Sequence, residues 1–499
     1  MADILLTHSY HLFYDPKQVR RMQPYPPLGT LYAASLLRQR GFSVALFDTM
    51  LEDPRRGFPA ALKRHRPRLV AIVEDNFNFL SKMCLTRMRE VAFGMLDQAR
   101  LAGATVVVNG FDASDHVDDF LRRGFDYALL GEPEWTLLEL ARGIEELPDI
   151  SGAIPGLAFL RSETQEVVRT APRPLMRRLD ELPLPARDLI DIDRYRQAWK
   201  TAHGFFSLNA VVSRGCPFQC NWCAKPIYGS SFHARSPESV AEEMQELKRA
   251  YGAEHVWFAD DIFALKPGWA LGLAEAVEER EAALPFKIQS RIDLMIPETA
   301  QALARAGCTE VWMGVESGSQ KILNAMNKST RVEEIPMARD GLRRYGIRAC
   351  FFLQFGYPGE SWEDIQETIR LVRQMQPDDI GVSVAYPLPG TKFHERVREE
   401  LGVKRNWVDS NDLSVMFKAA YTQEFYRALR DALHAEVETW SIPQCAPCGA
   451  RRAETLSHVA DAARLDCLWK TVERLEKTCR KTEPSLSSVQ ALAGAEPRR

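Results

Sequence analysis

Short apolar runs alternate with amphipathic helical segments along most of this chain. The first 150 residues hold five such runs, each flanked by Gly, Asp or Asn: residues 4–6, 44–47, 69–73, 105–108 and 127–130. Runs of this length are typical of buried strands, and their alternation with helices predicts a parallel sheet covered on both faces. We therefore expect an α/β protein whose residues 1–150 form a doubly wound domain, in which ligands bind beyond the carboxyl ends of the strands.

The same alternation resumes after a connector. Residues 151–203 are predicted to be a Pro-rich linker, since Pro172, Pro174, Pro183 and Pro185 interrupt helices and stiffen the chain. Six further runs then follow at residues 208–212, 255–259, 286–290, 310–314, 349–355 and 380–386. Six parallel strands with intervening helices predict a partial (β/α)6 barrel over residues 204–400. Residues 401–482 are predicted to be a helical extension, and the Ser-, Ala-, Glu- and Pro-rich stretch 483–499 to be disordered.

Composition narrows the class of protein. The formal net charge is -3, with 45% hydrophobic and 26% charged residues, which gives no reason to expect nucleic-acid binding. We find no apolar run of about 18 residues and no signal-peptide pattern, so we expect no membrane partner and a cytoplasmic location. In that reducing compartment the ten cysteines favour metal binding or packing over disulfides.

Three of these cysteines carry the most specific signal. Cys216, Cys220 and Cys223 have the spacing CxxxCxxC, directly after the predicted strand 208–212 and with Trp222 before the last thiol. Three thiolates on one loop can hold three corners of a 4Fe-4S cluster, which normally takes four protein ligands. The fourth iron is then open to a small molecule. Zinc is the competing interpretation, but zinc sites usually close with a fourth Cys or His, and the nearest candidate is His233.

This motif, in this position, resembles the radical S-adenosylmethionine (SAM) enzymes. The resemblance implies that Cys216, Cys220 and Cys223 bind a 4Fe-4S cluster beside Trp222, and that SAM chelates the open iron. An electron from the cluster then cleaves SAM to a 5′-deoxyadenosyl radical, which abstracts hydrogen from the substrate. A low-potential electron donor such as flavodoxin or ferredoxin is implied as a partner.

Other predicted strand ends match positions that contact SAM in this family. They are Asp260, Asp261, Ser290, Arg291, Glu316, Gln354 and Gly356. Carboxylates suit the ammonium of SAM, Arg suits its carboxylate, and Gly permits close approach of the backbone. Each residue alone could equally cap a helix or form an ion pair.

The first domain resembles the cobalamin-binding domain that precedes many radical SAM domains. The matching pieces are residues 26–31 (PPLGTL), 41–44 (GFSV) and 126–134 (DYALLGEPE). The resemblance implies cobalamin contacts at the strand ends, namely Thr7, His8, Glu74, Asn76, Gly110, Gly131 and Glu132. The chain lacks the DxHxxG motif that supplies a histidine to cobalt elsewhere, so the axial ligand stays unassigned. His8 and His11 lie on a plausible loop but could equally be core or solvated residues, and the domain could have lost its cofactor.

Together these resemblances imply a cobalamin-dependent radical SAM methyltransferase acting on a small molecule, in which methylcobalamin passes its methyl group to a substrate radical. A non-methylating cyclase or rearrangement enzyme, like the anaerobic magnesium-protoporphyrin cyclase, would use the same cofactors. A methylthiotransferase would need three further cluster cysteines, whereas Cys84 alone precedes Cys216. A cobalamin or iron–sulfur sensor is the alternative of another class, although we find no output module.

The C-terminal extension leaves one question open. Cys445 and Cys448 form a CxxC pair, with His458, Cys467 and Cys479 downstream. They could hold zinc or a second cluster, or be free thiols.

Overall fold

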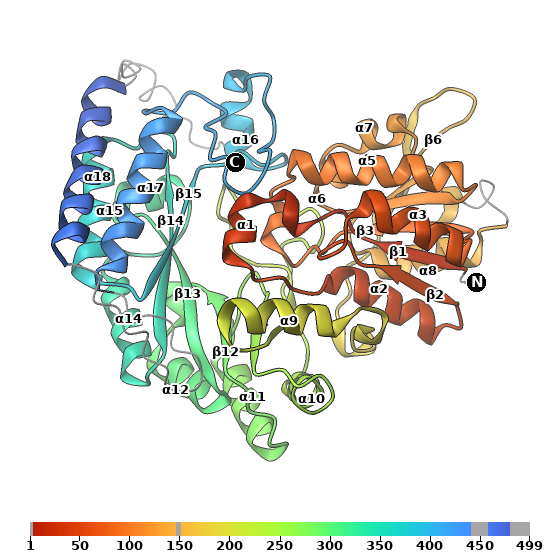
Figure 1. The fold of residues 1–499 in the computed structure, drawn as a ribbon, viewed down its shortest axis with the longest axis horizontal. Coiled ribbons are helices and arrows are strands. Elements are labelled where there is room, and N and C mark those ends of the chain that lie inside the picture. The colour runs from red at the N-terminus through yellow and green to blue at the C-terminus, as the bar shows by residue number, and fades with distance from the viewer. Residues whose placement is uncertain (1–2, 146–150, 441–457, 480–499) are drawn as a thin grey trace, which may run out of the picture.

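The computed structural model describes residues 3–145, 151–440 and 458–479, organised by two sheets that lie side by side (Figure 1). The N-terminal sheet has the strand order β2 (Val44–Phe47), β1 (Ile4–Thr7), β3 (Leu69–Val73), β4 (Thr105–Asn109), β5 (Tyr127–Leu129), β6 (Leu157–Leu160) and β7 (Val167–Arg169). The first five strands are parallel, as predicted, and β3 is buried along its whole length.

Helices cover both faces of this sheet because the strand residues that point to either face are apolar. Ile4 and Leu6 of β1 join the same apolar cluster as Leu28, whereas Leu5 joins Phe58 and Met95 in a second cluster. The helices are η1 (Leu12–Tyr14), α1 (Pro16–Arg21), α2 (Leu28–Gln39), α3 (Pro54–His65), α4 (Phe79–Lys82), α5 (Thr86–Leu101), α6 (Phe111–Asp115), α7 (Val117–Arg123) and α8 (Pro133–Arg142). The predicted doubly wound architecture is confirmed.

The connector differs from the expected linker. The hairpin of β6 and β7 pairs antiparallel onto β5, so the N-terminal sheet extends to Arg169 and not to residue 150. Both strands are short apolar runs joined by a polar loop, a signal that the nearby prolines obscured. The rest of the connector contains η2 (Ser151–Ala153), η3 (Leu179–Glu181), η4 (Arg187–Leu189) and α9 (Ile192–His203). Trp199 of α9 donates its indole N–H to the carbonyl oxygen of Pro24 at 2.7 Å, which ties the connector to the first domain.

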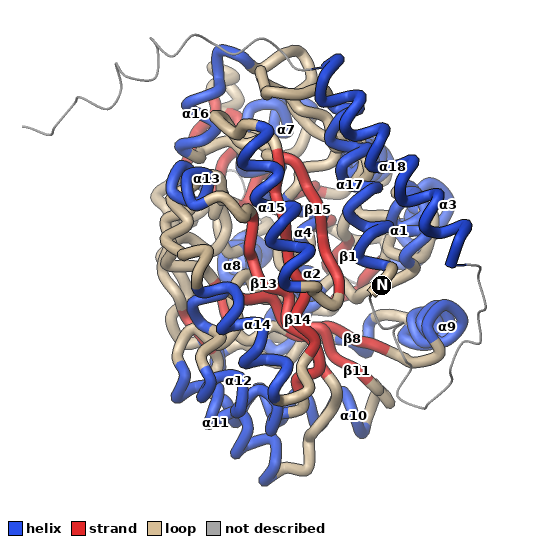
Figure 2. The backbone as a smooth tube through the Cα atoms, turned by 90° about the vertical axis from the view of Figure 1, so that its left-hand side faces the viewer, coloured by secondary structure: helices blue, strands red, loops and turns tan. Residues whose placement is uncertain are grey.

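The second sheet is the predicted open barrel of six parallel strands. Its order is β15 (Asp379–Val384), β14 (Arg348–Phe355), β13 (Cys308–Glu316), β12 (Phe286–Ser290), β11 (His255–Phe258) and β8 (Ser207–Ala210). Figure 2 shows helices along one side of these strands. They are α10 (Pro237–Arg249), α11 (Pro267–Glu279), η5 (Ile292–Leu294), α12 (Pro297–Ala306), α13 (Gln320–Ala325), α14 (Glu334–Arg344) and α15 (Trp362–Met375).

The faces of the barrel strands differ in chemistry. Val311, Met313 and Val315 on one face of β13 are fully buried, as are Phe351 and Leu353 on β14. The residues between them are Trp312 and Gly314 on β13 and Phe352 on β14, and the two aromatic side chains are half-buried. The apolar face therefore packs on the helices, and the mixed face lines the open side of the barrel.

The C-terminal region is less helical than predicted. After α16 (Lys392–Val397) and η6 (Arg398–Glu400), residues 401–422 form an irregular segment, followed by α17 (Gln423–Glu438) and α18 (His458–Cys479). α17 and α18 lie side by side near β15 (Figures 1 and 2). Cys445 and Cys448 lie outside the described residues, so the question of a second metal site there stays open.

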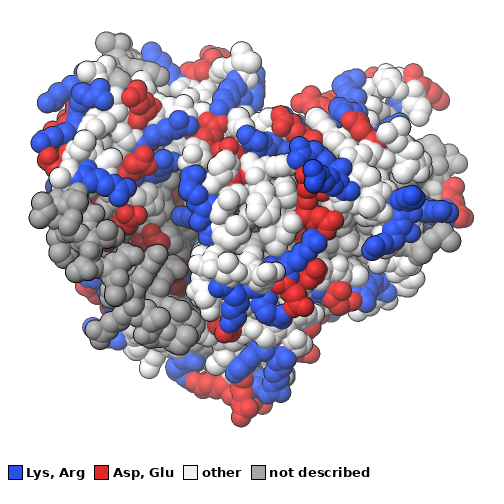
Figure 3. All heavy atoms as spheres, viewed as in Figure 1, with Lys and Arg blue, Asp and Glu red and all other residues white. Residues whose placement is uncertain are grey.

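The surface carries both signs of charge. Figure 3 shows Lys and Arg interspersed with Asp and Glu over the visible face, in agreement with a net charge of -3. Among the described helices, none is both long enough and apolar enough to cross a membrane.

Candidate functional site

The three cysteines lie on a loop whose neck is a short hairpin. β9 (Ser213–Arg214) pairs antiparallel with β10 (His233–Ala234), so residues 215–232 form one closed loop after β8. The thiols of Cys216, Cys220 and Cys223 are free and half-buried. Gly215 has a φ of 77°, and a Cβ there would lie 2.0 Å from the carbonyl oxygen of Ser231. The close approach at this neck therefore requires glycine.

Two polar residues that sequence analysis missed fix the shape of this cluster loop. Lys225 donates from Nζ to the carbonyl oxygen of Cys216 at 2.7 Å. The backbone N–H of Asn221 donates to the carbonyl oxygen of Met326 at 3.0 Å, and its side-chain oxygen accepts from the Tyr357 hydroxyl at 2.7 Å. The loop is thus anchored to the ends of two barrel elements. An ordered loop favours ligand binding because less conformational entropy is lost.

The chemistry of the loop fits an iron–sulfur cluster. The described residues contain no set of three or more His, Cys, Asp or Glu side chains arranged for a single metal ion. A cluster instead spreads its cysteine ligands over several irons. Burial raises the pKa of Cys216, and burial with the charge of Asp261 raises the pKa of Cys223 to about 12. Binding of a cluster must therefore release protons from these thiols.

The two aspartates at the end of β11 have different surroundings. Asp260 is buried and accepts hydrogen bonds from the backbone N–H of Val212 and from both the N–H and hydroxyl of Ser213. Burial nonetheless raises the pKa of Asp260 to about 7. Its carboxylate supports the neck of the cluster loop. Asp261 is 39% exposed and pairs with Lys82 of α4, so it lies at the open surface between the two domains.

Arg291 and Ser290 follow β12. The guanidinium of Arg291 lies 3.7 Å from the ring centroid of Phe218 on the cluster loop, and its Nη1 is 3.9 Å from the sulfur of Cys220. Asp293 holds the same guanidinium through Nε at 2.9 Å. Arg291 therefore lies against the cysteine loop, and its assignment as a SAM contact stays a prediction. The Ser290 hydroxyl donates its proton to the carbonyl oxygen of Phe263, so that proton is already engaged within the protein.

Glu316 is part of a buried ion pair that the sequence did not reveal. Lys328 Nζ lies 2.7 Å from Glu316 Oε1, and both side chains are less than a tenth exposed. Gly314 leaves room for this pair, because a Cβ there would lie 2.6 Å from Lys328 Nζ. Lys328 also lies 6.0 Å from the ring of Trp222, whose buried indole N–H has no partner. The structure thus brings Trp222, Glu316 and the cluster loop together.

The end of β14, the loop after it and α17 each hold a buried polar atom without a hydrogen-bond partner. They are Gln354 Oε1, Glu360 Oε1 and the hydroxyl of Tyr426 from α17. Gly356 has a φ of 77°, and a Cβ there would lie 3.1 Å from the Tyr426 ring. Its N–H donates to Glu360 Oε2 at 2.5 Å, and burial raises the pKa of Glu360 to about 8. Unpartnered buried groups of this kind are suited to a bound polar ligand.

The opposing edge of the N-terminal sheet brings Glu74, Asn76 and Gly110 together. Glu74 accepts from the N–H of Ser9 at 3.1 Å, and burial raises its pKa. Asn76 donates to Asn109 Oδ1 at 2.7 Å, but its own side-chain oxygen has no partner. A Cβ at Gly110 would lie 2.7 Å from Glu74 Cγ, so the close approach of Glu74 at this edge requires glycine.

The remaining predicted residues of the first domain are engaged elsewhere. Thr7 is fully buried beneath the edge, and His8 Nε2 lies 2.9 Å from Asp48 Oδ1. His11 Nδ1 lies 2.7 Å from the carbonyl oxygen of Thr49. Neither imidazole is exposed, so no axial ligand for cobalt can be assigned from them.

Gly131 and Glu132 lie at the seam with the barrel domain. A Cβ at Gly131 would lie 3.8 Å from the carbonyl oxygen of Ile227 beyond the cluster loop cysteines. Glu132 accepts from the N–H of Met176 at 2.6 Å and from Arg214 at 2.8 Å. Both residues contact protein atoms of the barrel side, and their assignment as cobalamin contacts stays a prediction.

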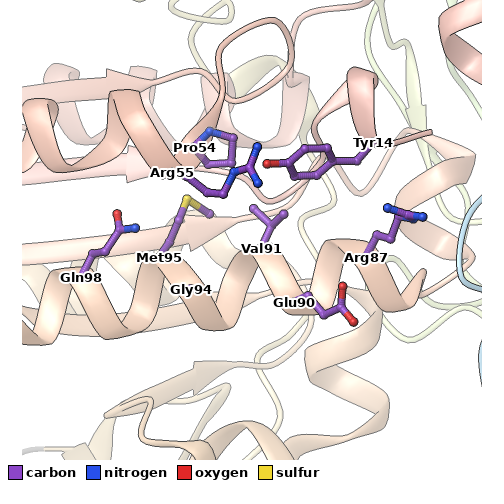
Figure 4. Close-up of a pocket in the computed structure, with 9 residues that line it drawn as sticks. All are labelled: Tyr14, Pro54, Arg55, Arg87, Glu90, Val91, Gly94, Met95 and Gln98. Carbon is purple, nitrogen blue, oxygen red and sulfur yellow. The ribbon is translucent and has the colours of Figure 1, made fainter. Parts of the chain in front are cut away.

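Three adjoining cavities begin at this N-terminal edge. The innermost cavity is lined by Glu74, Gly110 and Met88. Met88 also lines the second cavity. The outermost, about 380 Å³, is the groove of Figure 4. It is lined by Tyr14, Pro54, Arg55, Arg87, Glu90, Val91, Gly94, Met95 and Gln98. The residues present fit a cofactor that carries amide groups, such as cobalamin, because the unpartnered Asn76 oxygen can accept from an amide N–H and the groove of about 380 Å³ adjoins this edge.

The irregular segment 401–422 bridges the two domains beside the site. The carbonyl oxygen of Trp407 accepts from Thr86 N–H of α5 at 2.9 Å, and Asn406 Oδ1 accepts from Arg89 at 3.2 Å. Tyr386, after β15, donates its hydroxyl to the carbonyl oxygen of Met83 at 3.0 Å. The segment has no periodic pattern, so these contacts had no sequence signal.

Comparison with known proteins identifies the barrel. Residues 210–372 match the family model described as the radical SAM superfamily. An uncharacterized methyltransferase of Pyrococcus horikoshii is 26% identical over 415 residues, which are 82% of this chain and 86% of that protein. The anaerobic magnesium-protoporphyrin IX monomethyl ester cyclase of Cereibacter sphaeroides is 27% identical over 397 residues, 76% of this chain and 61% of that protein.

Solved structures share both domains. The radical SAM methyltransferase TsrM of Kitasatospora setae, solved with cobalamin and a 4Fe-4S cluster, aligns with a TM-score of 0.65 at 22% identity, over 80% of this chain and 75% of that chain. The cobalamin-dependent radical SAM enzyme OxsB aligns with a TM-score of 0.63 at 19% identity, over 76% of this chain and 52% of that chain. The fold, the cysteine loop and the family match agree: residues 210–372 form a radical SAM domain, and a doubly wound N-terminal domain precedes it.

Proposed function

We propose that this protein is a cobalamin-dependent radical SAM methyltransferase that acts on a small molecule. One observation carries the proposal: the cysteine loop of the barrel packs directly against the strand-end edge of the N-terminal sheet. Phe77, next to Asn76 on that edge, stacks on Tyr228 beyond the cysteines at 4.9 Å between ring centroids. Groups bound at the two edges would therefore lie next to each other.

The residues present divide naturally between two cofactors and a substrate. Cys216, Cys220 and Cys223 would hold the cluster, and Arg291, Glu316 and Gln354 would contact SAM. When bound, the cluster and SAM supply a radical that removes hydrogen from the substrate, and cobalamin supplies a methyl group. Asn76 and Gly110 would face the cobalamin side.

The chain itself would contribute positioning and exclusion of water. The bridging contacts of Tyr386 and Trp407 place residues of the C-terminal segment beside both edges. Such enclosure limits side reactions of a reactive intermediate and holds the substrate near both groups. A low-potential reductant such as flavodoxin or ferredoxin would supply the electron.

The names of the relatives support methyl transfer. The Pyrococcus protein and TsrM are both called methyltransferases, and TsrM was also solved with its tryptophan substrate. The cyclase relative favours a second candidate, a non-methylating reaction with the same cofactors.

Product analysis separates these candidates. Anaerobic, reconstituted enzyme would be incubated with SAM, a reductant and small-molecule extracts, and both SAM-derived products would be measured. Methyl transfer predicts S-adenosylhomocysteine and 5′-deoxyadenosine together, in proportion to the methylated product. Deoxyadenosine with product but without S-adenosylhomocysteine would establish the cyclase-type alternative.

A further inference from the structure

A buried charge cluster crosses the seam between the two domains. Arg214 of β9 donates from Nη1 to Glu132 at 2.8 Å and from Nη2 to Glu134 at 2.6 Å. Both carboxylates belong to the segment at the start of α8 in the N-terminal domain. Their side chains and that of Arg214 are at most 6% exposed. These charges are therefore removed from water and depend on one another.

Three aromatic rings enclose the same guanidinium. Its carbon lies 5.8 Å from the ring centroid of Tyr32 on α2, 5.5 Å from that of Phe77 and 5.2 Å from that of Tyr228. Two of these rings come from the N-terminal domain and one from the segment beyond the cluster cysteines. Cation–π attraction is strongest where the cation is desolvated, as here.

The position of Arg214 links the two proposed cofactor sites. It lies two residues before Cys216, at the neck of the cluster loop. It contacts Phe77, which directly follows Asn76 with its unpartnered oxygen. One side chain thus touches the segments that would hold each cofactor. Glu132 also accepts from Met176 N–H in the connector, so a third segment is fixed at the same point.

The cost of burying unpaired charge requires Arg214 to keep its two-sided pairing with Glu132 and Glu134. Removing either side of this contact would leave a guanidinium or two carboxylates buried and unpaired, which is strongly unfavourable. A lysine keeps the charge but cannot donate in two planar directions at once. The arrangement therefore depends on arginine itself.

We propose that Arg214 is a positioning residue that sets the placement of the cluster loop relative to the cofactor edge of the N-terminal domain. The proposal rests on the proposed function, in that both edges carry cofactors. Arg214 does not touch reacting atoms, and it acts through the two segments that it joins.

The test compares two arginine-to-lysine variants of the reconstituted holoenzyme. Arg214→Lys alters the seam, whereas Arg187→Lys alters a fully buried arginine paired with Glu243 on the barrel side. The measurement is magnetic broadening of the cob(II)alamin electron paramagnetic resonance signal by the reduced cluster, which depends steeply on their separation. We expect Arg214→Lys to retain iron and cobalt but change the broadening at least about 2-fold, with Arg187→Lys like wild type. Unchanged broadening in Arg214→Lys would overturn the proposal.

A second measurement does not depend on cobalamin. Amide hydrogen exchange of the full chain should become at least about 10-fold faster in both residues 74–82 and 216–231 of Arg214→Lys, and in neither segment of Arg187→Lys. Protection equal to wild type in both segments would contradict the positioning role. If wild type binds no corrinoid, the proposed function fails, while the exchange result still decides whether Arg214 couples the segments.

Discussion

The two facing strand edges are built in different ways. At the barrel edge, charged side chains are already paired: Asp260 supports the loop neck, Arg291 is held by Asp293, and Glu316 is held by Lys328. At the N-terminal edge, a glycine packed against Glu74 and a buried Asn76 oxygen without a partner replace such ion pairs. The barrel edge is therefore held by paired charges, whereas the N-terminal edge depends on close packing and keeps an acceptor for a ligand. We therefore expect that removing a charged or thiol side chain impairs ligand binding most at the barrel edge. Adding side-chain volume should impair ligand binding most at the N-terminal edge.

The largest expected effect lies at the barrel edge. Replacing Cys216, Cys220 and Cys223 together by Ala removes every thiol of the cluster loop, so iron binding and 5′-deoxyadenosine formation should be lost entirely. Iron analysis and chromatography of the SAM products measure this. Cys467→Ala, which changes an exposed thiol on α18, is the matched control and should retain both. Cluster iron surviving in the triple variant would refute the ligand assignment.

The next effect tests the N-terminal edge. Gly110→Val places carbon atoms against Glu74, since a Cβ alone would lie 2.7 Å from Glu74 Cγ. We expect bound corrinoid to fall at least about 10-fold with cluster iron unchanged, measured on one reconstituted sample. Gly268→Ala on α11, where a Cβ meets no atom within 4 Å, should change neither. Full corrinoid binding by Gly110→Val would place the cofactor elsewhere.

A third prediction concerns the buried ion pair. Lys328→Met leaves Glu316 buried without its cation, which should destabilise the fold by about 3–5 kcal/mol and weaken SAM binding about 10-fold. Denaturant unfolding and equilibrium SAM binding measure the two effects. Lys321→Met removes the exposed partner of Asp364 and should cost no more than about 1 kcal/mol. Equal losses in both variants would show that burial of the Glu316 pair does not matter.

The smallest effect is a pH dependence at the barrel edge. Burial raises the pKa of Glu360 from 4.5 to about 8, so the native state keeps this proton where the unfolded chain has lost it. The native state binds more protons over that interval, and its stability should therefore fall as the pH rises from 4.5 to about 8. Unfolding curves at several pH values measure this slope. Glu360→Gln should flatten it, exposed Glu395→Gln should not, and identical slopes in all three proteins would contradict the account.

The fold was predictable because its signals are periodic. The five parallel strands of the first domain and all six barrel strands appeared as short apolar runs, since a parallel strand is buried on both faces. The β6–β7 hairpin was missed because its two runs lie beside prolines that favoured a linker. The segment 401–422 could not be predicted, since its contacts with α5 come from backbone groups and single side chains.

The site was predictable where a motif fixes it. The cysteine loop and the strand-end residues Arg291 and Glu316 do meet at one edge. Lys328, Asn221 and Arg214 were missed because their roles depend on partners distant in sequence: Glu316 for Lys328, Tyr357 for Asn221, and Glu134 for Arg214. A residue whose role is to form a hydrogen bond or ion pair with a distant partner has no recognisable sequence pattern. A buried cation near a motif becomes visible only in three dimensions.

The most direct test of the central claim, that the two edges hold separate cofactors, is joint iron and cobalt analysis after anaerobic reconstitution with iron, sulfide and cobalamin. Wild type should bind about four irons and about one cobalt per chain. The Cys216→Ala/Cys220→Ala/Cys223→Ala variant should lose the iron and keep the cobalt. Four irons without cobalt in wild type would contradict the account, because the N-terminal edge would then hold no corrinoid.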